Sequence, residues 1–248
     1  MSLELRLVKT ATDDAAAQRL AREALWLREL GEVRSLEGQL PRLIEQGTDG
    51  AGHPYLVIGI QPGTAETRAF TTDHARFLVS LGRARFHAAE FEHSGKCQWI
   101  QRSLPKDAPL LQESYYDAEK ALVYWSGPYV LSQGDFAPWN IRRFGEQLFV
   151  FDWGSVHTDA SPLDDALHYL MIQRRLKTVR LLRKAMGRAH EVALAAYPEW
   201  SWRPPVIGAL TIVYLLGVIL HRGVDRADPV VGAYWRLLEK RSIWMKEN

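Results

Sequence analysis

Three polar residues lie close together in the sequence, between apolar runs that are typical of buried strands. They are Asp135, Asn140 and Asp152, in the stretch LSQGDFAPWNIRRFGEQLFVFDWG at positions 131–154. Asn140 follows Asp135 by five residues, and Asp152 follows Asn140 by twelve, with a predicted hairpin in between. Because such a hairpin brings its ends side by side, we expect the three side chains to converge. Asn and Asp are also common turn formers, but all three at this spacing favour a site.

This set of side chains suits the transfer of a phosphoryl group. Two oxygen ligands on strand ends, from Asn140 and Asp152, suit a hard cation such as Mg²⁺, which keeps waters and binds substrate phosphates. A third group, the carboxylate of Asp135, can accept a proton from an attacking hydroxyl. Phosphoryl transfer needs this arrangement because its catalysis is mostly positioning and charge neutralisation.

The elements that position these residues can be predicted from periodicity. Leucines alternate with charged residues ahead of Lys9, which indicates a half-buried strand with Lys9 on the leucine face. A helix capped by Asp13 or Asp14 is expected to run to Gly31. Segments 40–47 and 54–60 predict an antiparallel hairpin. From position 71 onward helical periodicity dominates, interrupted by two short strands around a turn at positions 145–146. The pattern predicts a small sheet with one helix over 1–62, a hinge near residue 60, and a larger, mainly helical lobe over 63–248.

Composition bounds the classes of function. The 248 residues are 47% hydrophobic and 24% charged with a net charge of +2, which is ordinary for a globular protein and argues against a nucleic-acid partner. The single cysteine, Cys97, excludes an intramolecular disulfide, and the start of the chain lacks the features of a signal peptide. A cytoplasmic location is therefore expected. The most apolar run, 206–220, is shorter than the roughly 20 residues of a membrane span, so a buried helix is expected there instead.

Other kinds of site have little support. The sequence has no G-x-x-x-x-G-K-[ST] loop and no G-x-S-x-G elbow, which excludes P-loop and serine-hydrolase interpretations. His87, His93 and Cys97 do not match a zinc-binding spacing.

The segments QGDFAPWN and FVFDWG resemble the catalytic loop and metal aspartate of the aminoglycoside phosphotransferase and choline kinase superfamily. The family pattern is H-G-D-x-x-x-x-N, followed by an apolar strand that ends in D-[WF]. The resemblance implies an α+β, protein-kinase-like two-lobed fold with a small antiparallel-sheet lobe. It makes Asp135 the catalytic base and Asn140 and Asp152 the Mg²⁺ ligands. Gln133 stands where the family usually has His and is expected to hold the loop, and Asp165 is expected to be a buried brace for it.

The N-terminal part resembles the nucleotide side of the same family. LRLVKTA resembles the strand that carries the phosphate-binding lysine, which makes Lys9 the candidate for the α- and β-phosphates of ATP. LAREALWL resembles the helix whose glutamate, here Glu23, pairs with that lysine. YLVIGIQPG resembles the last small-lobe strand, so backbone groups near Gly59 and Gln61 are expected to face adenine. The cofactors implied are ATP and Mg²⁺.

One feature of the family is missing. Kinases cover the nucleotide phosphates with a glycine-rich hairpin before the lysine strand, but only eight residues precede Lys9. The sequence is consistent with a truncated chain, with a misassigned start, or with a nucleotide held with one lid missing. The last case predicts weak ATP binding or a pseudokinase that acts as a non-catalytic binding module.

The acceptor is expected to be a hydroxyl of a small molecule, of the aminoglycoside, choline or amino alcohol, or sugar type. Only thirteen residues separate Asp152 from Asp165 and no Ala-Pro-Glu motif is present, so a protein Ser/Thr kinase is the less favoured alternative. Trp139 could stack on a sugar or face a quaternary ammonium, or simply pack under the loop. The acidic and tyrosine-rich segment 107–120 could attract a cationic acceptor, or could be the solvated face of a helix. The sequence does not indicate an oligomeric state or distinguish ATP from GTP.

Overall fold

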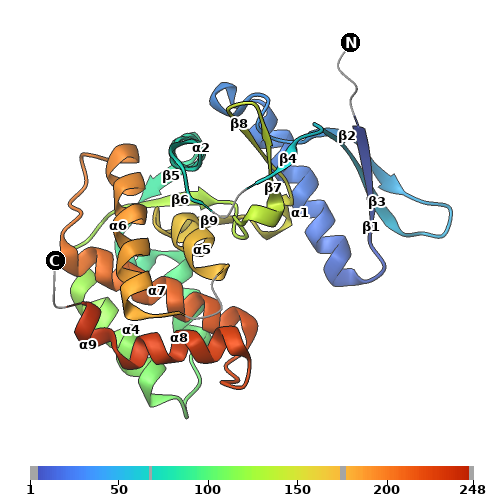
Figure 1. Cartoon of the computed structure of the whole chain (residues 1–248). Helices are drawn as coiled ribbons and strands as arrows, with labels where there is room; N and C mark the ends of the chain where they lie inside the picture. Colours follow the sequence, from blue (N-terminus) through green and yellow to red (C-terminus); the bar gives the residue numbers. More distant parts are fainter. Residues whose placement is uncertain (1–4, 67–68, 174–176, 246–248) are drawn as a thin grey trace.

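The computed structural model describes residues 5–66, 69–173 and 177–245 of the chain. Figure 1 shows a small sheet with one long helix at one end of the molecule and a group of packed helices at the other. This arrangement agrees with the predicted small sheet, single helix and larger helical lobe. The division at residues 62 and 63 stays a prediction, and the chain leaves the small sheet between Ile60 and Thr64.

The small sheet carries three antiparallel strands in the order β1-β3-β2. Its elements are β1 (Leu5–Thr10), α1 (Asp14–Gly31), β2 (Arg42–Thr48) and β3 (Pro54–Ile60). The side chain of Asp13 accepts a hydrogen bond from the backbone N–H of Ala16 at 2.7 Å and caps α1. The capped helix, the hairpin and the strand that carries Lys9 are therefore confirmed. The prediction that this strand is half-buried was wrong, because Leu5 and Leu7 are 41% and 38% exposed.

Two further sheets of three strands position the loops between the lobes. The first pairs β4 (Thr64–Ala65), β7 (Ile141–Phe144) and β8 (Gln147–Val150), and the second pairs β5 (Phe86–Ala88), β6 (Pro128–Ser132) and β9 (His157–Ala160). The β7–β8 hairpin turns at Gly145, as predicted. The strands β4, β5 and β9 were not predicted, because segments of two to four residues are too short to show a period.

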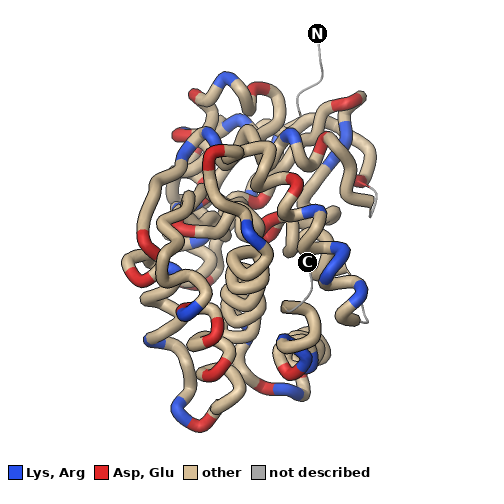
Figure 2. The backbone as a smooth tube through the Cα atoms, turned by 90° about the vertical axis from the view of Figure 1, so that its left-hand side faces the viewer, with Lys and Arg blue, Asp and Glu red and all other residues tan. Residues whose placement is uncertain are grey.

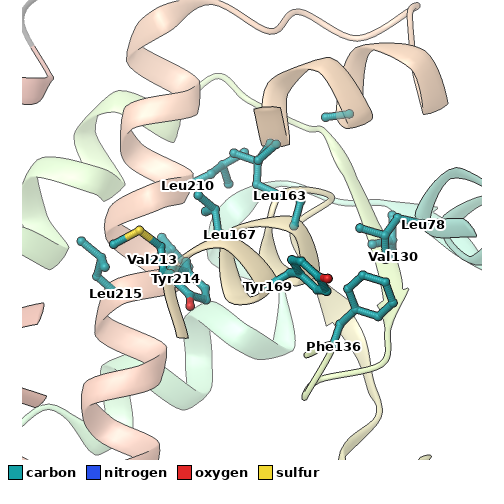
Figure 3. Packing of buried hydrophobic residues seen from close by; sticks show 14 of the residues in the cluster. Leu78, Val130, Phe136, Leu163, Leu167, Tyr169, Leu210, Val213, Tyr214 and Leu215 are labelled. Carbon is teal, nitrogen blue, oxygen red and sulfur yellow. The ribbon is translucent and has the colours of Figure 1, made fainter. Parts of the chain in front are cut away.

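The larger lobe consists mainly of helices. They are α2 (Thr72–Ala84), α3 (Gly95–Ser103), α4 (Pro109–Leu122), α5 (Asp164–Ile172), α6 (Val179–Ala196), α7 (Pro204–Arg222), α8 (Pro229–Glu239) and α9 (Arg241–Trp244). In Figure 3, Leu163 and Leu167 at the start of α5 lie beside Leu210 of α7, and Tyr169 lies near Phe136. The helix α5 is therefore anchored in the core and also reaches the loop that follows β6.

The helix α7 is longer than the apolar run predicted from the sequence. Its 19 residues are long and apolar enough to cross a membrane by length and composition, but 67% of this stretch is buried inside the protein. Its residues pack against α4, α5 and α8, which is the environment expected for a core helix. Figure 2 shows positive and negative residues interspersed along the chain.

A buried histidine packs against the loop that follows β6. The ring of His74 in α2 lies 4.6 Å from the ring of Tyr169 and 6.0 Å from that of Phe136, measured between centroids. Its Nδ1 accepts a hydrogen bond from the backbone N–H of Thr71 at 3.1 Å, and its Nε2 has no partner among the described residues. Burial lowers the pKa of His74 to about 4, so the imidazole is neutral in the folded protein at neutral pH.

We expect the stability of the protein to fall as the pH drops from about 6.5 to about 4, in part because of His74. In this window the unfolded chain binds a proton at His74 and the folded chain does not, so the free energy of unfolding decreases as the pH falls. The variant His74→Gln should remove up to about 3 kcal/mol of that decrease. Urea unfolding of both proteins at several pH values measures it, and a difference that does not change with pH would contradict the assignment.

Candidate active site

The loop that carries Asp135 is shaped by one glycine. Gly134 has a φ of +84°, and a Cβ placed on it would lie 1.9 Å from the carbonyl oxygen of Ser155. Only glycine adopts this conformation without strain and leaves room for the neighbouring backbone. The close approach brings the loop after β6 against the short helix Trp153–Ser155 that follows the second aspartate of the motif.

Both carboxylate oxygens of Asp135 have polar side-chain partners. The side-chain amide of Asn140 donates to Oδ2 of Asp135 at 2.8 Å and to its backbone carbonyl at 2.9 Å. Nε2 of His168, from α5, lies 3.1 Å from the other oxygen, Oδ1. The structure therefore brings Asp135 and Asn140 together, as their spacing predicts, and adds a histidine.

The protonation of Asp135 reflects these contacts. Burial alone would raise the pKa of Asp135, but the hydrogen bond and charge of His168, together with hydrogen bonds from Asn140 and Trp139, lower it below the usual value. The group is an ionised carboxylate at neutral pH. Trp139 itself is half exposed next to it, so the indole borders the open side of the loop.

Asp165 lies beneath the loop and ties it to α5. One of its oxygens accepts hydrogen bonds from Ser132 Oγ at 2.7 Å and from the backbone N–H of Gly134 at 3.1 Å, and the other accepts from the backbone N–H of Gln133 at 2.8 Å. Burial raises the pKa of Asp165, whereas these donors act in the opposite direction. The three donors orient the end of β6 and hence the residue that follows it.

Gln133 connects the two aspartate segments. Its amide nitrogen donates to the backbone carbonyl of Asp152 at 2.7 Å and to that of Phe151 at 3.2 Å. Its amide oxygen accepts the backbone N–H of Asp135 at 2.9 Å. One fully buried side chain thus fixes the distance between the two segments.

Asp152 lies where the small sheet meets the loops. It has a φ of 65°, a left-handed conformation that is uncommon for residues other than glycine. Its side chain is 52% exposed, and its Oδ1 is 3.2 Å from the Nζ of Lys9. Lys9 also donates to both oxygens of Glu23, at 2.8 and 2.9 Å. Lys9, Glu23 and Asp152 therefore form one group, although Lys9 and Asp152 are 143 residues apart in the sequence.

Glu23 is the most enclosed member of this group. Its side chain is 2% exposed and also lies 3.4 Å from the backbone N–H of Trp153. Burial raises the pKa of Glu23 and the ammonium group of Lys9 opposes this effect. Pairing with a buried glutamate restricts the long lysine side chain to the direction of Asp152.

Gly59 and Gln61, whose backbone groups were predicted to face adenine, differ in whether their backbone is paired within the sheet. Gly59 is paired with Arg6 on one side and with Arg42 on the other, so it lies inside the sheet. Gln61 follows Ile60, the last paired residue of β3, so its backbone lies beyond the strand ladder on the path toward the larger lobe.

Asn140 and Asp152 carry the atoms that could hold a divalent cation. Asn140 uses its amide N–H groups on Asp135, which leaves its Oδ1 as a possible ligand, and Asp152 presents a half-exposed carboxylate. Amide and carboxylate oxygens are the ligands that Mg²⁺ prefers, and it commonly retains waters and bridges to phosphates. The donor set therefore fits the predicted metal.

The residues considered for a zinc site, His87, His93 and Cys97, are engaged in separate contacts. Cys97 is buried with its sulfur 2.9 Å from the hydroxyl of Tyr115, and His87 pairs with Asp159. His93 lies near Glu90 and Glu92, all three exposed, a grouping that is common on surfaces without an ion. None of these residues contacts the loop of Asp135 through an interaction described above.

His168 is a site residue that the sequence motifs did not predict. It is three residues after Asp165 on α5, and residues at this spacing lie on the same face of a helix. That spacing could have suggested that the face of α5 that braces the loop also carries a histidine. It could not have shown that the imidazole reaches Asp135, because this depends on how α5 packs.

Comparisons with known proteins identify the family. Residues 3–202 match the family model described as the phosphotransferase enzyme family. This match covers most of the 248 residues, so the chain belongs to that family, whose members are kinases that act on a hydroxyl group of a small molecule. A sequence search of curated proteins gave no match.

Solved structures confirm the fold. A ternary complex of a thermostable mutant of aminoglycoside phosphotransferase APH(4)-Ia with ADP and hygromycin B has a TM-score of 0.61 at 12% identity, over 98% of this chain and 88% of that chain. The GDP complex of aminoglycoside 2'-phosphotransferase-IIIa has a TM-score of 0.61 at 16% identity, over 96% of this chain and 86% of that chain. The expected α+β, protein-kinase-like two-lobed fold is therefore confirmed.

The contact between His168 and Asp135 leads to a prediction about protonation. Replacing His168 by Phe keeps a ring in α5 but removes the donor and the charge that favour the ionised carboxylate, so we expect the pKa of Asp135 to rise. Carbon-13 NMR of the Asp135 carboxyl group over a pH titration measures it. The variant His53→Phe, at a half-exposed histidine in the β2–β3 loop, should leave that titration unchanged. An unchanged pKa in His168→Phe would show that the two groups do not interact in solution.

Proposed function

We propose that this protein transfers the γ-phosphoryl group of ATP to a hydroxyl of a small molecule, with Mg²⁺ as the metal. The observation that carries the proposal is the carboxylate of Asp135, kept ionised and oriented by Asn140 and His168 beside the group formed by Lys9, Glu23 and Asp152. A base for an alcohol and a cationic residue for phosphates are the two parts that the reaction needs from the protein.

Each residue has a distinct part in this proposal. Asp135 accepts the hydrogen bond of the acceptor hydroxyl and takes its proton as the oxygen bonds to the γ-phosphorus. The bond between the γ-phosphorus and the bridging oxygen breaks, and ADP leaves with that oxygen. Lys9, steadied by Glu23, would hold the α- and β-phosphates, and the backbone near Gly59 and Gln61 would face adenine, with Gln61 the better placed of the two.

The proposed metal rests on the ligand atoms of this chain, and the proposed nucleotide also has support from similar structures. Asn140 and Asp152 would hold Mg²⁺, which supplies charge neutralisation at the phosphates when bound. Two of the similar structures contain a nucleotide together with an aminoglycoside, one ADP with hygromycin B and the other GDP with kanamycin. The proposed location is the cytoplasm, where ATP is available, and the family match favours this enzyme over a protein kinase.

Binding of the nucleotide can be tested without knowing the acceptor. In a thermal shift experiment, ATP with Mg²⁺ at about a hundred times its dissociation constant should raise the melting temperature by about 5 to 10 °C. The variant Asp152→Ala should lose the Mg²⁺-dependent part of this rise. Asp107→Ala, at an exposed aspartate in the α3–α4 connection, is the control and should keep all of it.

A second variant separates binding from turnover. Asp135→Asn should keep the thermal shift but lower the rate of phosphoryl transfer at least about a hundredfold, because the acceptor loses its base. If wild-type protein shows no shift at millimolar nucleotide, the alternative of a non-catalytic binding module is supported and the proposed reaction is wrong.

A further inference from the structure

A group of basic and imidazole side chains lies next to the catalytic loop and has no part in the proposed reaction. Its members are Arg22 on α1, Lys96 on α3, His157 at the start of β9 and His221 on α7. We call these four residues the His157 cluster. They come from four elements of both lobes, so only the folded chain brings them together.

His157 fixes the position of this cluster relative to Asp135. It pairs with Ser132 of β6 across the sheet. Its imidazole also occupies the space beside Gly134, because a Cβ placed on that glycine would lie 3.1 Å from Cδ2 of the ring. Gly134 directly precedes Asp135, so the His157 ring borders the loop of the proposed base.

The other members approach from three directions. The Nζ of Lys96 forms an ion pair with Oδ2 of Asp164, and its Cε lies 3.6 Å from a Cβ placed on Gly217 of α7. His221 is four residues after Gly217, about one turn further along the same face. Arg22 is three residues after Arg19, whose backbone packs against Gly154, and so lies on the face of α1 that is turned toward this region.

The electrostatics of His157 are consistent with this placement. Burial by the surrounding chain and then the charge of Lys96 lower the pKa of His157, with His221 and Arg22 acting in the same direction and Asp164 in the opposite one. The charge of Lys96 therefore acts on His157 more strongly than the carboxylate of Asp164 does. Asp164 is only 7% exposed, and its Oδ1 has no hydrogen-bond partner among the described residues. This oxygen could accept a hydrogen bond from a hydroxyl group of a ligand.

The acidic residues that could have attracted a cationic acceptor are engaged elsewhere. On α4, Asp117 and Glu113 pair with Arg241 at 2.6 and 3.2 Å. In Figure 1, α4 and α9 lie at the end of the helical lobe away from the small sheet. The solvated-face interpretation of this part of segment 107–120 is the one that these ion pairs support.

We infer that the acceptor carries an anionic group, a carboxylate or a phosphate, which binds at the His157 cluster while its hydroxyl reaches Asp135. This inference rests on the proposed function, because it assigns the acceptor of the same reaction. Lys96 donates to Asp164 and still has ammonium protons for an anion. His157 adds an imidazole beside Gly134, and His221 and Arg22 act electrostatically on that imidazole in the same direction as Lys96. A polycationic aminoglycoside would therefore meet like charges there.

Binding of matched sugars tests the inference directly. Glucose 6-phosphate and glucuronate carry the two anionic groups, glucose is neutral, and glucosamine is cationic. With ADP and Mg²⁺ present at pH 7, each is titrated while the imidazole resonances of His157 and His221 are followed by NMR. The two anions should shift both resonances in a saturable way and bind at least about tenfold more tightly than glucose, a difference of about 1.4 kcal/mol. Comparison of the two anions decides between phosphate and carboxylate.

Variants assign the effect to the cluster. The double variant Arg22→Gln with His221→Gln changes two exposed side chains and leaves the ion pair of Lys96 with Asp164 in place. It should weaken the binding of the preferred anion at least about tenfold. Arg180→Gln, at an exposed arginine on α6, removes one positive charge elsewhere and should leave the affinity unchanged. Equal melting temperatures of the unliganded proteins check that the variants fold.

The outcomes separate this inference from the proposed function. If ATP with Mg²⁺ stabilises the wild type but neither anion shifts the His157 resonance, or if glucosamine binds best, the anionic acceptor is wrong and the kinase proposal stands. If the anions bind at His157 but nucleotide does not bind, the cluster is an anion site and the reaction is wrong. Release of ADP with the four sugars, measured in the same protein, should follow the order of their affinities.

Discussion

The hydrogen bonds accepted by the buried carboxylate of Asp165 are the interaction on which the loop of Asp135 depends. The donors are Ser132 Oγ and two consecutive backbone N–H groups at the end of β6. Buried backbone donors need partners, and leaving them unpaired costs more than an average hydrogen bond contributes. Because α5 is itself packed against α7 in the core (Figure 3), the position of Asp135 follows from the packing of the helical lobe.

A second constraint joins this loop to the small sheet. Gln133 holds the backbone of Asp152 on one side, and Glu23 contacts the backbone of Trp153 on the other. Between these contacts Asp152 takes a left-handed conformation, which surrounding structure must stabilise in a residue other than glycine. The same glutamate binds Lys9. The side chains proposed for phosphates, metal and base are therefore held by buried polar groups that connect both lobes.

The two groups of charged side chains next to the loop of Asp135 differ in composition. The group formed by Lys9, Glu23 and Asp152 contains two carboxylates and one ammonium group, whereas the four basic or imidazole side chains of the His157 cluster lie near the carboxylate of Asp164. In a partly buried site an excess of charge of one sign acts on a ligand more strongly than it would in water. Within a fold shared by enzymes of different substrates, the selectivity for an acceptor is therefore expected to come from side chains on α1, α3, β9 and α7 around the common loop.

The sequence by itself determined the candidate site residues Asp135, Asn140 and Asp152, the small sheet with its capped helix, the β7–β8 hairpin and the family. These features depend on short-range spacing, since Asp135, Asn140 and Asp152 lie on one loop and one hairpin. The pairing of Lys9 with Glu23 was expected only through the resemblance, and the contact of Lys9 with Asp152 was not predicted. Tertiary structure alone decided the contact of His168 with Asp135, the three short strands, the pairing of α4 acids with Arg241, and the His157 cluster. Each joins elements that are distant in sequence, and no local period or spacing specifies how such elements pack.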